Sequence, residues 1–180
     1  MTPHLADTPV LETDRLRLRA PDAQDWPLWN AFAQSDRAEH IGGPYTLRTA
    51  WRGFAHVVGM WVLRGYGSFV ITAKDDDTAL GMAGPWHPAD WPEQEIGWTI
   101  WAPENEGKGI AFEAAQAARR FAYDRLGWTT AVSYIDAPNT RSIALAERLG
   151  ATRDPNAEAP NNGSDTEVLV YRHPAPEAVH

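Results

Sequence analysis

Residues 95–113 read EIGWTIWAPENEGKGIAFE, and this stretch decides the fold more than any other. Aromatic and β-branched side chains over 95–101 predict a strand. In the loop that follows, Gly107 and Gly109 stand on either side of Lys108, and glycine permits backbone conformations that other residues resist. A helix is predicted directly after this loop. The unpaired amides of its first turn would point outward, where they can hold a phosphate group.

The glycine loop matches neither of the two best-known phosphate-binding patterns. Lys108 is followed by glycine, where a Walker loop has Ser or Thr. Phe112 stands three residues after Gly109, where the dinucleotide fingerprint has a third Gly or Ala. A glycine loop can also be a turn and nothing more, so its function depends on the segments around it.

The rest of the chain predicts alternating strands and helices. Strands are predicted over residues 11–19, 66–73, 79–86, 95–101, 129–135 and 166–172. Helices are predicted after an N-cap at Asp22, from Thr46 to Gly65, over 110–126, and over 138–149 with Gly150 as the C′ residue. This order predicts an α/β (α+β) fold in which helices lie on both sides of a sheet.

Length and composition fit one globular domain. The chain has 180 residues, a formal net charge of −8, 43% hydrophobic residues and no Cys. This length supports a single core. The lack of cysteine excludes a disulfide scaffold, a thiolate zinc site and a Cys nucleophile. We expect no metal site, because no two histidines form a ligand pair at helical spacing.

Charge and hydropathy also limit the partners. The chain has two lysines, and no basic run is longer than Arg119–Arg120, so we expect no binding to nucleic acid. Residues 78–89 form the longest stretch free of Asp, Glu, Lys and Arg, far below the about 20 residues of a membrane span. The N-terminal residues lack the pattern of a secretory signal. We therefore expect a cytoplasmic protein with no membrane partner.

A second motif makes the glycine loop more informative. Residues 137–151 read APNTRSIALAERLGA and follow the strand predicted over 129–135. The order of strand, glycine loop, long helix, strand and this motif resembles the GCN5-related N-acetyltransferase (GNAT) superfamily. Within it, the chain is most similar to the branch of the ribosomal-protein-alanine acetyltransferases. The resemblance spans roughly residues 11–171 and is strongest over 95–151.

The resemblance implies a GNAT-like architecture. The expected sheet is mixed, mostly antiparallel and built from six to seven strands, and its two central parallel strands splay apart. About four helices are expected on its two faces. Length and resemblance together predict one acetyltransferase-like domain over residues 1–180, with a core at about 11–172. Flexible tails are expected at 1–10 and at 173–180, where the sequence is rich in Pro and Ala.

The same resemblance implies acetyl-CoA as the co-substrate. It assigns the pyrophosphate to amides of the glycine loop, the pantetheine arm to the end of the preceding strand, and a cofactor contact to the asparagine of the second motif. These cofactor-binding residues are Trp98, Thr99, Ile100, Gly107, Lys108, Gly109, Ile110, Ala111 and Asn139. For Asn139, the alternative is a plain N-cap.

Two positions depart from the family pattern. Glu104 stands where Arg or Gln is usual, and Phe112 stands where Thr or Ser is usual. These departures motivate an alternative function, a non-catalytic acyl-CoA-binding regulatory module.

Transfer of an acetyl group to an amine benefits from a base, because an amine with a pKa of about 10 is about 0.1% neutral at pH 7. Glu95 is the first candidate for this base, followed by Glu93 and His87. The alternative for Glu95 is a surface position or an ion pair. By the resemblance, Ser142 lies next to the departing sulfur, and its alternative is an ordinary first-turn residue. Without cysteine, we expect direct transfer in a ternary complex.

The acceptor stays open between a protein N-terminus and a small-molecule amine. The helix pair over 22–65 and the loop over 154–165 are expected to shape its pocket. A homodimer is a further expectation, which depends on an apolar, Trp-rich surface.

Overall fold

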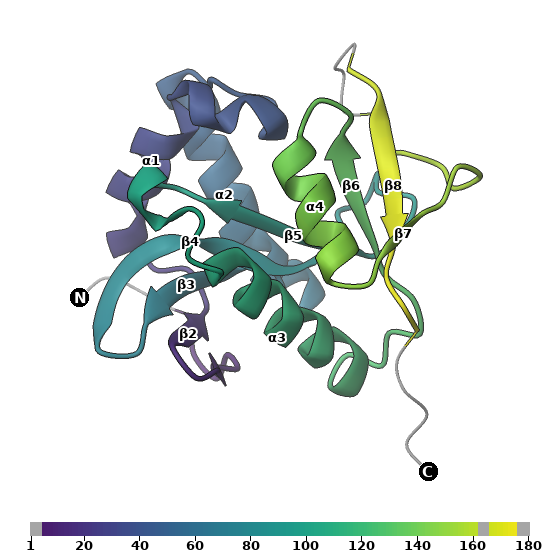
Figure 1. The fold of residues 1–180 in the computed structure, drawn as a ribbon. Helices are drawn as coiled ribbons and strands as arrows, with labels where there is room; N and C mark the ends of the chain where they lie inside the picture. Colours follow the sequence, from purple (N-terminus) through teal and green to yellow (C-terminus); the bar gives the residue numbers. More distant parts are fainter. Residues whose placement is uncertain (1–4, 162–165, 176–180) are drawn as a thin grey trace.

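The structure is a computed structural model, and it describes residues 5–161 and 166–175. One sheet of eight strands runs through the molecule in the order β1-β2-β3-β4-β5-β6-β8-β7 (Figure 1). The strands are β1 (Leu11–Glu12), β2 (Leu16–Arg19), β3 (Phe69–Ala73), β4 (Asp76–Trp86), β5 (Glu95–Ile100), β6 (Val132–Asp136), β7 (Thr152–Arg153) and β8 (Val168–Arg172). Neighbouring strands are antiparallel except β5 and β6, which are parallel. The predicted fold class is confirmed.

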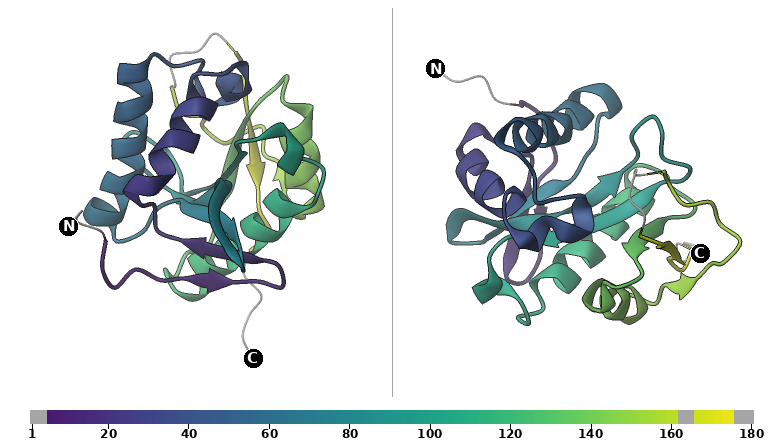
Figure 2. Two further views of the ribbon diagram at one scale, coloured as in Figure 1. Left: turned by 90° about the vertical axis from the view of Figure 1, so that its left-hand side faces the viewer. Right: turned by 90° about the horizontal axis from the view of Figure 1, so that it is seen from above.

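Helices cover both faces of the sheet (Figure 2). The α-helices are α1 (Trp26–Ala33), α2 (Leu47–Arg64), α3 (Ile110–Asp124) and α4 (Thr140–Arg148). Three short 3-10 helices are η1 (Ala23–Asp25), η2 (Asp36–Ile41) and η3 (Pro103–Asn105). Local sequence explains their ends. Asp22 caps η1, Thr46 caps α2, and Gly65 and Gly150 end their helices with φ angles of 76° and 84°.

The alternation of side chains along the strands divides the core into two layers. Val70 and Met82 pack with α1 and α2 around Trp29. On the opposite face, Ile71 and Ala83 pack with α3. The register of β4 and β5 pairs Met82 with Thr99 and Trp86 with Glu95. The odd-numbered residues of β5 therefore face α1 and α2, and the even-numbered residues face α3.

The two central parallel strands separate almost at once. They form one register pair, Glu95 with Val132, and the Val132 amide donates to the Gln94 carbonyl at 2.9 Å. Beyond this pair, residues 96–100 of β5 and 133–136 of β6 share no ladder pair within the described part of the chain. We call these two unpaired segments the notch. The notch is the predicted splay.

Three predictions change in detail. The sheet has eight strands instead of six to seven, because two-residue strands β1 and β7 form its edges. The strand expected over 11–19 is divided by a turn in which the Thr13 amide donates to the Leu16 carbonyl at 3.0 Å. A flexible tail from residue 173 is wrong for His173, which is 3% exposed and whose amide donates to the Ala131 carbonyl at 2.9 Å. Residues 1–4 and 176–180 of the expected tails, and 162–165 of the expected loop, lie outside the described residues.

Candidate active site

The glycine loop has the conformation that an anion site needs. Gly107 and Gly109 have φ angles of 70° and 77°, in the left-handed region that favours glycine. Gly109 is the N-cap of α3, and no side chain caps the helix there. A Cβ atom at Gly107 would have no heavy atom within 4 Å, so the loop is open on that side. The first-turn amides of α3 are therefore suited to hold a phosphate group.

Arg15, which the sequence did not single out, fixes this loop through its carbonyl side. Its guanidinium donates to the Lys108 carbonyl at 3.0 Å and forms an ion pair of 2.7 Å with Glu113 in the first turn of α3. Thr13 donates to the same carboxylate at 2.5 Å. Because the carbonyl of Lys108 is engaged with Arg15, the loop is held to the body of the protein without using its amide groups.

Two predicted site residues meet beside the notch. The indole nitrogen of Trp98 donates to the Oγ atom of Ser142 at 3.3 Å. Asn139 is the N-cap of α4, where its Oδ1 atom accepts from the Ser142 amide at 3.2 Å. The cap reading of Asn139 is thus confirmed, and its role toward a cofactor stays a prediction. The contact brings the end of β5 next to the start of α4.

The three predicted strand contacts are not equivalent. The Trp101 amide donates to the Leu80 carbonyl at 3.0 Å, so by antiparallel alternation the main chain of Thr99 also faces β4. The Ile100 carbonyl accepts from Arg37 at 3.0 Å. Trp98 points its main-chain groups toward β6, where it has no ladder partner. Of the three residues predicted to contact the pantetheine arm, Trp98 is therefore the one whose main chain faces β6 with no ladder partner.

Glu95 is a partly buried carboxylate at the register pair with Val132, where the notch begins. Its Oε2 atom accepts from the Trp91 indole at 2.6 Å. No Arg, Lys or His within the described ranges forms an ion pair with it. Burial raises the pKa of Glu95 to about 7, although the hydrogen bonds from Trp91 and from the Tyr134 amide lower it. A carboxyl group with such a pKa exchanges protons readily near neutral pH.

Glu93, the second candidate base, has a different role. Both of its carboxylate oxygens lie 2.8 Å from the guanidinium of Arg172. The hydrogen bond from Arg172 lowers the pKa of Glu93. A carboxylate held in this way is a poor proton acceptor, so Glu93 is a structural ion-pair residue.

The two candidate catalytic side chains approach the notch from opposite faces of the sheet. Glu95 is an odd-numbered residue of β5 and faces α1 and α2, as its pairing with Trp86 shows. Ser142 lies on α4 and contacts the even-numbered Trp98. A group bound between β5 and β6 would thus have a proton acceptor on one side and a hydroxyl on the other.

The helix η2 lies across the ends of both central strands. From it, Arg37 donates to the Trp101 carbonyl at 3.1 Å and forms an ion pair of 2.6 Å with Glu106. His40 contacts Asp136 at the end of β6 at 3.3 Å. Glu106 also forms an ion pair of 2.5 Å with Arg141 of α4. These contacts join distant segments, and no local pattern in the sequence indicated them.

The two departures from the family pattern have structural explanations. Glu104 lies in η3 with an exposed side chain. Phe112 is partly buried, and the guanidinium carbon of Arg148 lies 3.9 Å from the centre of its ring. Phe112 therefore connects α3 with α4. Within residues 5–161 and 166–175, no group of three or more His, Cys, Asp or Glu side chains is arranged to hold a metal ion.

Comparison with known proteins agrees with this geometry. The acetyltransferase (GNAT) domain family matches residues 15–152. An acetyltransferase from Agrobacterium tumefaciens strain C58 is 38% identical, with 96% of this chain and 98% of that chain covered and a TM-score of 0.85. A protein from Bordetella pertussis assigned to the same family is 26% identical, with 92% and 99% covered and a TM-score of 0.74.

A more distant structure is RimL, a ribosomal L7/L12 alpha-N-protein acetyltransferase in complex with coenzyme A. It is 20% identical, with 92% of this chain and 97% of that chain covered and a TM-score of 0.71, so the likeness shows the fold alone. In the described part of the chain, no helix has the length and apolar character needed to cross a membrane. On the family match and the 38% identical relative, the chain belongs to the GNAT acetyltransferase family and is an acyltransferase.

Proposed function

We propose that this acyltransferase is an acetyl-CoA-dependent N-acetyltransferase that transfers the acetyl group directly to a primary amine in a ternary complex. The acceptor is a protein N-terminus or a small-molecule amine. The observation that carries the proposal is the carboxyl group of Glu95, which is partly buried, has no cationic partner among the described residues and has a pKa raised to about 7 by burial.

The residues around the notch fit acetyl-CoA. The uncapped start of α3 and the open left-handed Gly107 suit a pyrophosphate. The unpaired main chain of Trp98 suits the amide groups of a pantetheine arm. We assign the pyrophosphate to the amides of residues 107–111, the arm to Trp98, and a further cofactor contact to Asn139. When bound, acetyl-CoA supplies an activated thioester whose thiol has a pKa of about 8.5 and departs readily.

Glu95 and Ser142 have separate roles in the transfer, Glu95 toward the amine and Ser142 toward the departing thiolate. Glu95 accepts a proton from the amine through a carboxylate oxygen, directly or through water, and a pKa close to the working pH favours this transfer. Ser142 receives a hydrogen bond from the Trp98 indole, so its own proton is directed elsewhere. We assign this hydroxyl to a hydrogen bond that stabilises the departing thiolate, while Ser142 keeps its proton and the thiolate takes up a proton from solvent. With no Cys in the chain, a thiol acyl-enzyme is excluded.

The test is release of free thiol from acetyl-CoA in the presence of amine acceptors. The panel contains peptides with free N-termini, polyamines and amino acids, and each peptide has a matched control with a blocked N-terminus. We expect thiol release to depend on one class of free amine and to be lost with the blocked control. Binding of coenzyme A without thiol release on any amine, with Glu95→Gln behaving as the wild type, would contradict the proposal and favour the non-catalytic module.

A cytoplasmic location, a homodimer and a single domain over residues 1–180 stay predictions. Light scattering of the purified chain measures its oligomeric state directly. Limited proteolysis followed by mass spectrometry tests whether a stable fragment shorter than the whole chain separates from it.

A further inference from the structure

A buried chain of polar side chains ends where β5 and β6 stop pairing. The hydroxyl of Ser133 lies 2.6 Å from the Ile96 carbonyl and 2.9 Å from the Nε2 atom of His173. The Nδ1 atom of His173 lies 3.2 Å from the guanidinium of Arg119, which also donates to the Leu149 carbonyl at 2.6 Å. Ser133 and His173 are 2% and 3% exposed. Buried groups with this many partners have a fixed orientation.

The chemistry of these groups gives every hydrogen bond a direction. Arginine only donates, so Nδ1 of His173 accepts and the ring proton is on Nε2. Nε2 then donates to the Ser133 oxygen, and the Ser133 hydroxyl donates to the Ile96 carbonyl. Burial, and to a lesser extent Arg119, lowers the pKa of His173 to about 3, so the ring stays neutral. The hydroxyl of Ser133 is therefore aimed at β5.

The Ser133 hydroxyl donates to the Ile96 carbonyl, which would accept the next hydrogen bond if the β5–β6 ladder continued. In a parallel ladder continued past Glu95 and Val132, the Ile96 carbonyl would accept from the Tyr134 amide, and the Tyr134 carbonyl would accept from the Trp98 amide. Ser133 holds the first of these carbonyls instead. The Tyr134 amide is left to the carboxylate of Glu95, where it contributes to lowering the pKa.

We propose that Ser133 is a positioning residue, oriented by His173 and Arg119, that ends the β5–β6 ladder. It thereby keeps the main chain of Trp98 open and leaves the Tyr134 amide to the carboxylate of Glu95. The ligand that Trp98 receives, the arm of coenzyme A, rests on the proposed function. The effect on the ladder does not, because it concerns only hydrogen bonds within the protein.

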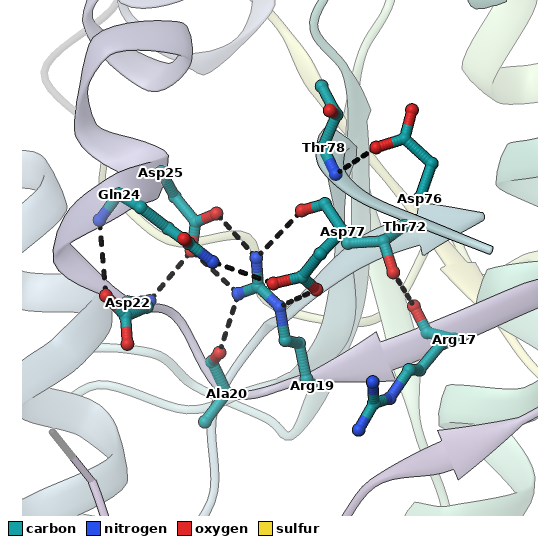
Figure 3. Close-up of polar contacts among 10 residues, drawn as sticks. All are labelled: Arg17, Arg19, Ala20, Asp22, Gln24, Asp25, Thr72, Asp76, Asp77 and Thr78. Atoms are coloured by element: carbon teal, nitrogen blue, oxygen red, sulfur yellow. Dashed lines mark hydrogen bonds and ion pairs between the residues drawn. The ribbon is translucent and has the colours of Figure 1, made fainter. Parts of the chain in front are cut away.

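The test compares Ser133→Ala with Thr72→Val in the full chain. Thr72 is a matched control, since it is 0% exposed and its hydroxyl donates to the Arg17 carbonyl of the neighbouring strand at 3.3 Å (Figure 3). It lies on β3, which β4 separates from β5 and the notch. Hydrogen exchange resolved by NMR follows the amides of Trp98 and Tyr134. Calorimetry measures the Kd of coenzyme A.

For Ser133→Ala we expect the ladder to lengthen. The Trp98 amide should exchange at least about tenfold more slowly, and coenzyme A should bind about tenfold more weakly, the size expected for about one hydrogen bond. Thr72→Val should change neither quantity. If Ser133→Ala keeps the wild-type exchange rate at Trp98 and the wild-type Kd, the proposal is wrong.

If Ser133→Ala does not fold, a second pair of variants tests the positioning role of Ser133. His173→Gln keeps both a donor and an acceptor, and His173→Leu removes them at similar size. We expect the Gln variant to retain coenzyme A binding and fast exchange at Trp98, and the Leu variant to lose both. Equal behaviour of the two would overturn the proposal. If the wild type binds no coenzyme A, the proposed function fails, while the exchange rates still test Ser133.

Discussion

Asp25 and Glu95 are both carboxylates withdrawn from solvent, yet their surroundings differ. Asp25 is 2% exposed and lies 2.8 and 2.9 Å from the guanidinium nitrogens of Arg19, and the Asp22 amide donates to it at 2.7 Å (Figure 3). Arg19 also forms an ion pair of 2.7 Å with Asp77. The pKa of Arg19 is raised, mainly by the hydrogen bond to Asp25. Glu95 has an indole and an amide as donors, but no cation within residues 5–161 and 166–175. Burial with a cation fixes structure, whereas burial without one produces a group that exchanges protons near neutral pH.

Two hollows of the surface can be compared with the notch in the same way. Two hollows of about 200 Å³ each lie beside the Arg19 cluster, and Arg17 and Asp77 line both. A hollow with charged walls resembles a binding site, but Asp77, which lines both hollows, already forms an ion pair with Arg19. At the notch, the main chain of Trp98 has no ladder partner, and the carboxylate of Glu95 has hydrogen-bond donors but no cation among the described residues. Polar groups without a ladder or ion-pair partner therefore indicate the candidate site better than the two hollows do.

The largest expected effect is on catalysis. Glu95→Gln should lower turnover by about 10²–10⁴-fold, the usual contribution of a general base, because the amide cannot accept the proton. The Kd of coenzyme A should stay within about twofold, since Glu95 is not assigned to the cofactor. Steady-state kinetics and calorimetry on one preparation check both. Turnover within about threefold of the wild type would show that Glu95 is not the general base. Glu95 would then not differ from Asp25 in function.

The reciprocal change should affect stability instead. Asp25→Asn leaves Arg19 partly uncompensated, so we expect the free energy of unfolding to fall by about 3 kcal/mol, at the lower end for a broken buried pair because Asp77 remains. Turnover per folded molecule should not change. Urea unfolding measures the first quantity and kinetics the second. A loss of turnover in a fully folded Asp25→Asn protein would mean that the two regions are coupled.

The pH dependence of stability should have opposite signs at Glu95 and Glu93. The pKa of Glu95 is raised in the folded state, so the folded state binds the proton more tightly, and stability falls as pH rises from about 4.5 to about 7. Relative to Glu95→Gln, the wild type should lose on the order of 2 kcal/mol over this range.

The pKa of Glu93 is lowered by Arg172, so its contribution to stability is present at neutral pH and lost as pH falls below its ordinary value. Glu93→Gln should therefore be destabilised at pH 7 and approach the wild type in acid. Thermal unfolding at several pH values measures both variants. Equal pH dependence in the two variants would show that the environments of these carboxylates do not differ as described.

The smallest expected effect comes from replacing a glycine that has a positive φ angle. Two such glycines distinguish the cost of backbone strain from the loss of coenzyme A binding. Gly107 and Gly127 have the same φ angle of 70°, and a Cβ atom would meet nothing within 4 Å at either. Alanine at each position should cost about 1–2 kcal/mol of stability for the left-handed conformation. Only Gly107→Ala should also weaken coenzyme A binding, because only Gly107 is assigned to the pyrophosphate. Equal Kd values for both variants would contradict that assignment.

The sequence predicted those features that depend on local patterns. The cap at Asp22, the start of α2 at Thr46, the end of α4 at Gly150 and the glycine loop before α3 follow from residue types at fixed offsets. These features could be placed without knowing which distant segments touch. The resemblance assigned both Trp98 and Ser142 to acetyl-CoA, but it did not predict the hydrogen bond between them.

The features that the sequence missed depend on contacts between distant segments. Arg15 reaches Glu113 and the glycine loop, and Arg172 binds Glu93 but not Glu95, although the two carboxylates are two residues apart. The sequence predicted a flexible tail from His173 because Pro and Ala follow it, whereas in the structure His173 is buried and contacts Arg119 and Ser133. A charged or polar residue gives no sign in the sequence of which partner it will have.

The most direct test of this account is the titration of the Glu95 carboxyl carbon by NMR in the full chain without ligand, with Glu95→Gln used to assign the signal. We predict a midpoint near pH 7, because burial without a cation disfavours the carboxylate. A midpoint at about 4.3, the ordinary value for Glu, would mean that Glu95 is solvated like any surface carboxylate, and the contrast with Asp25 would be wrong.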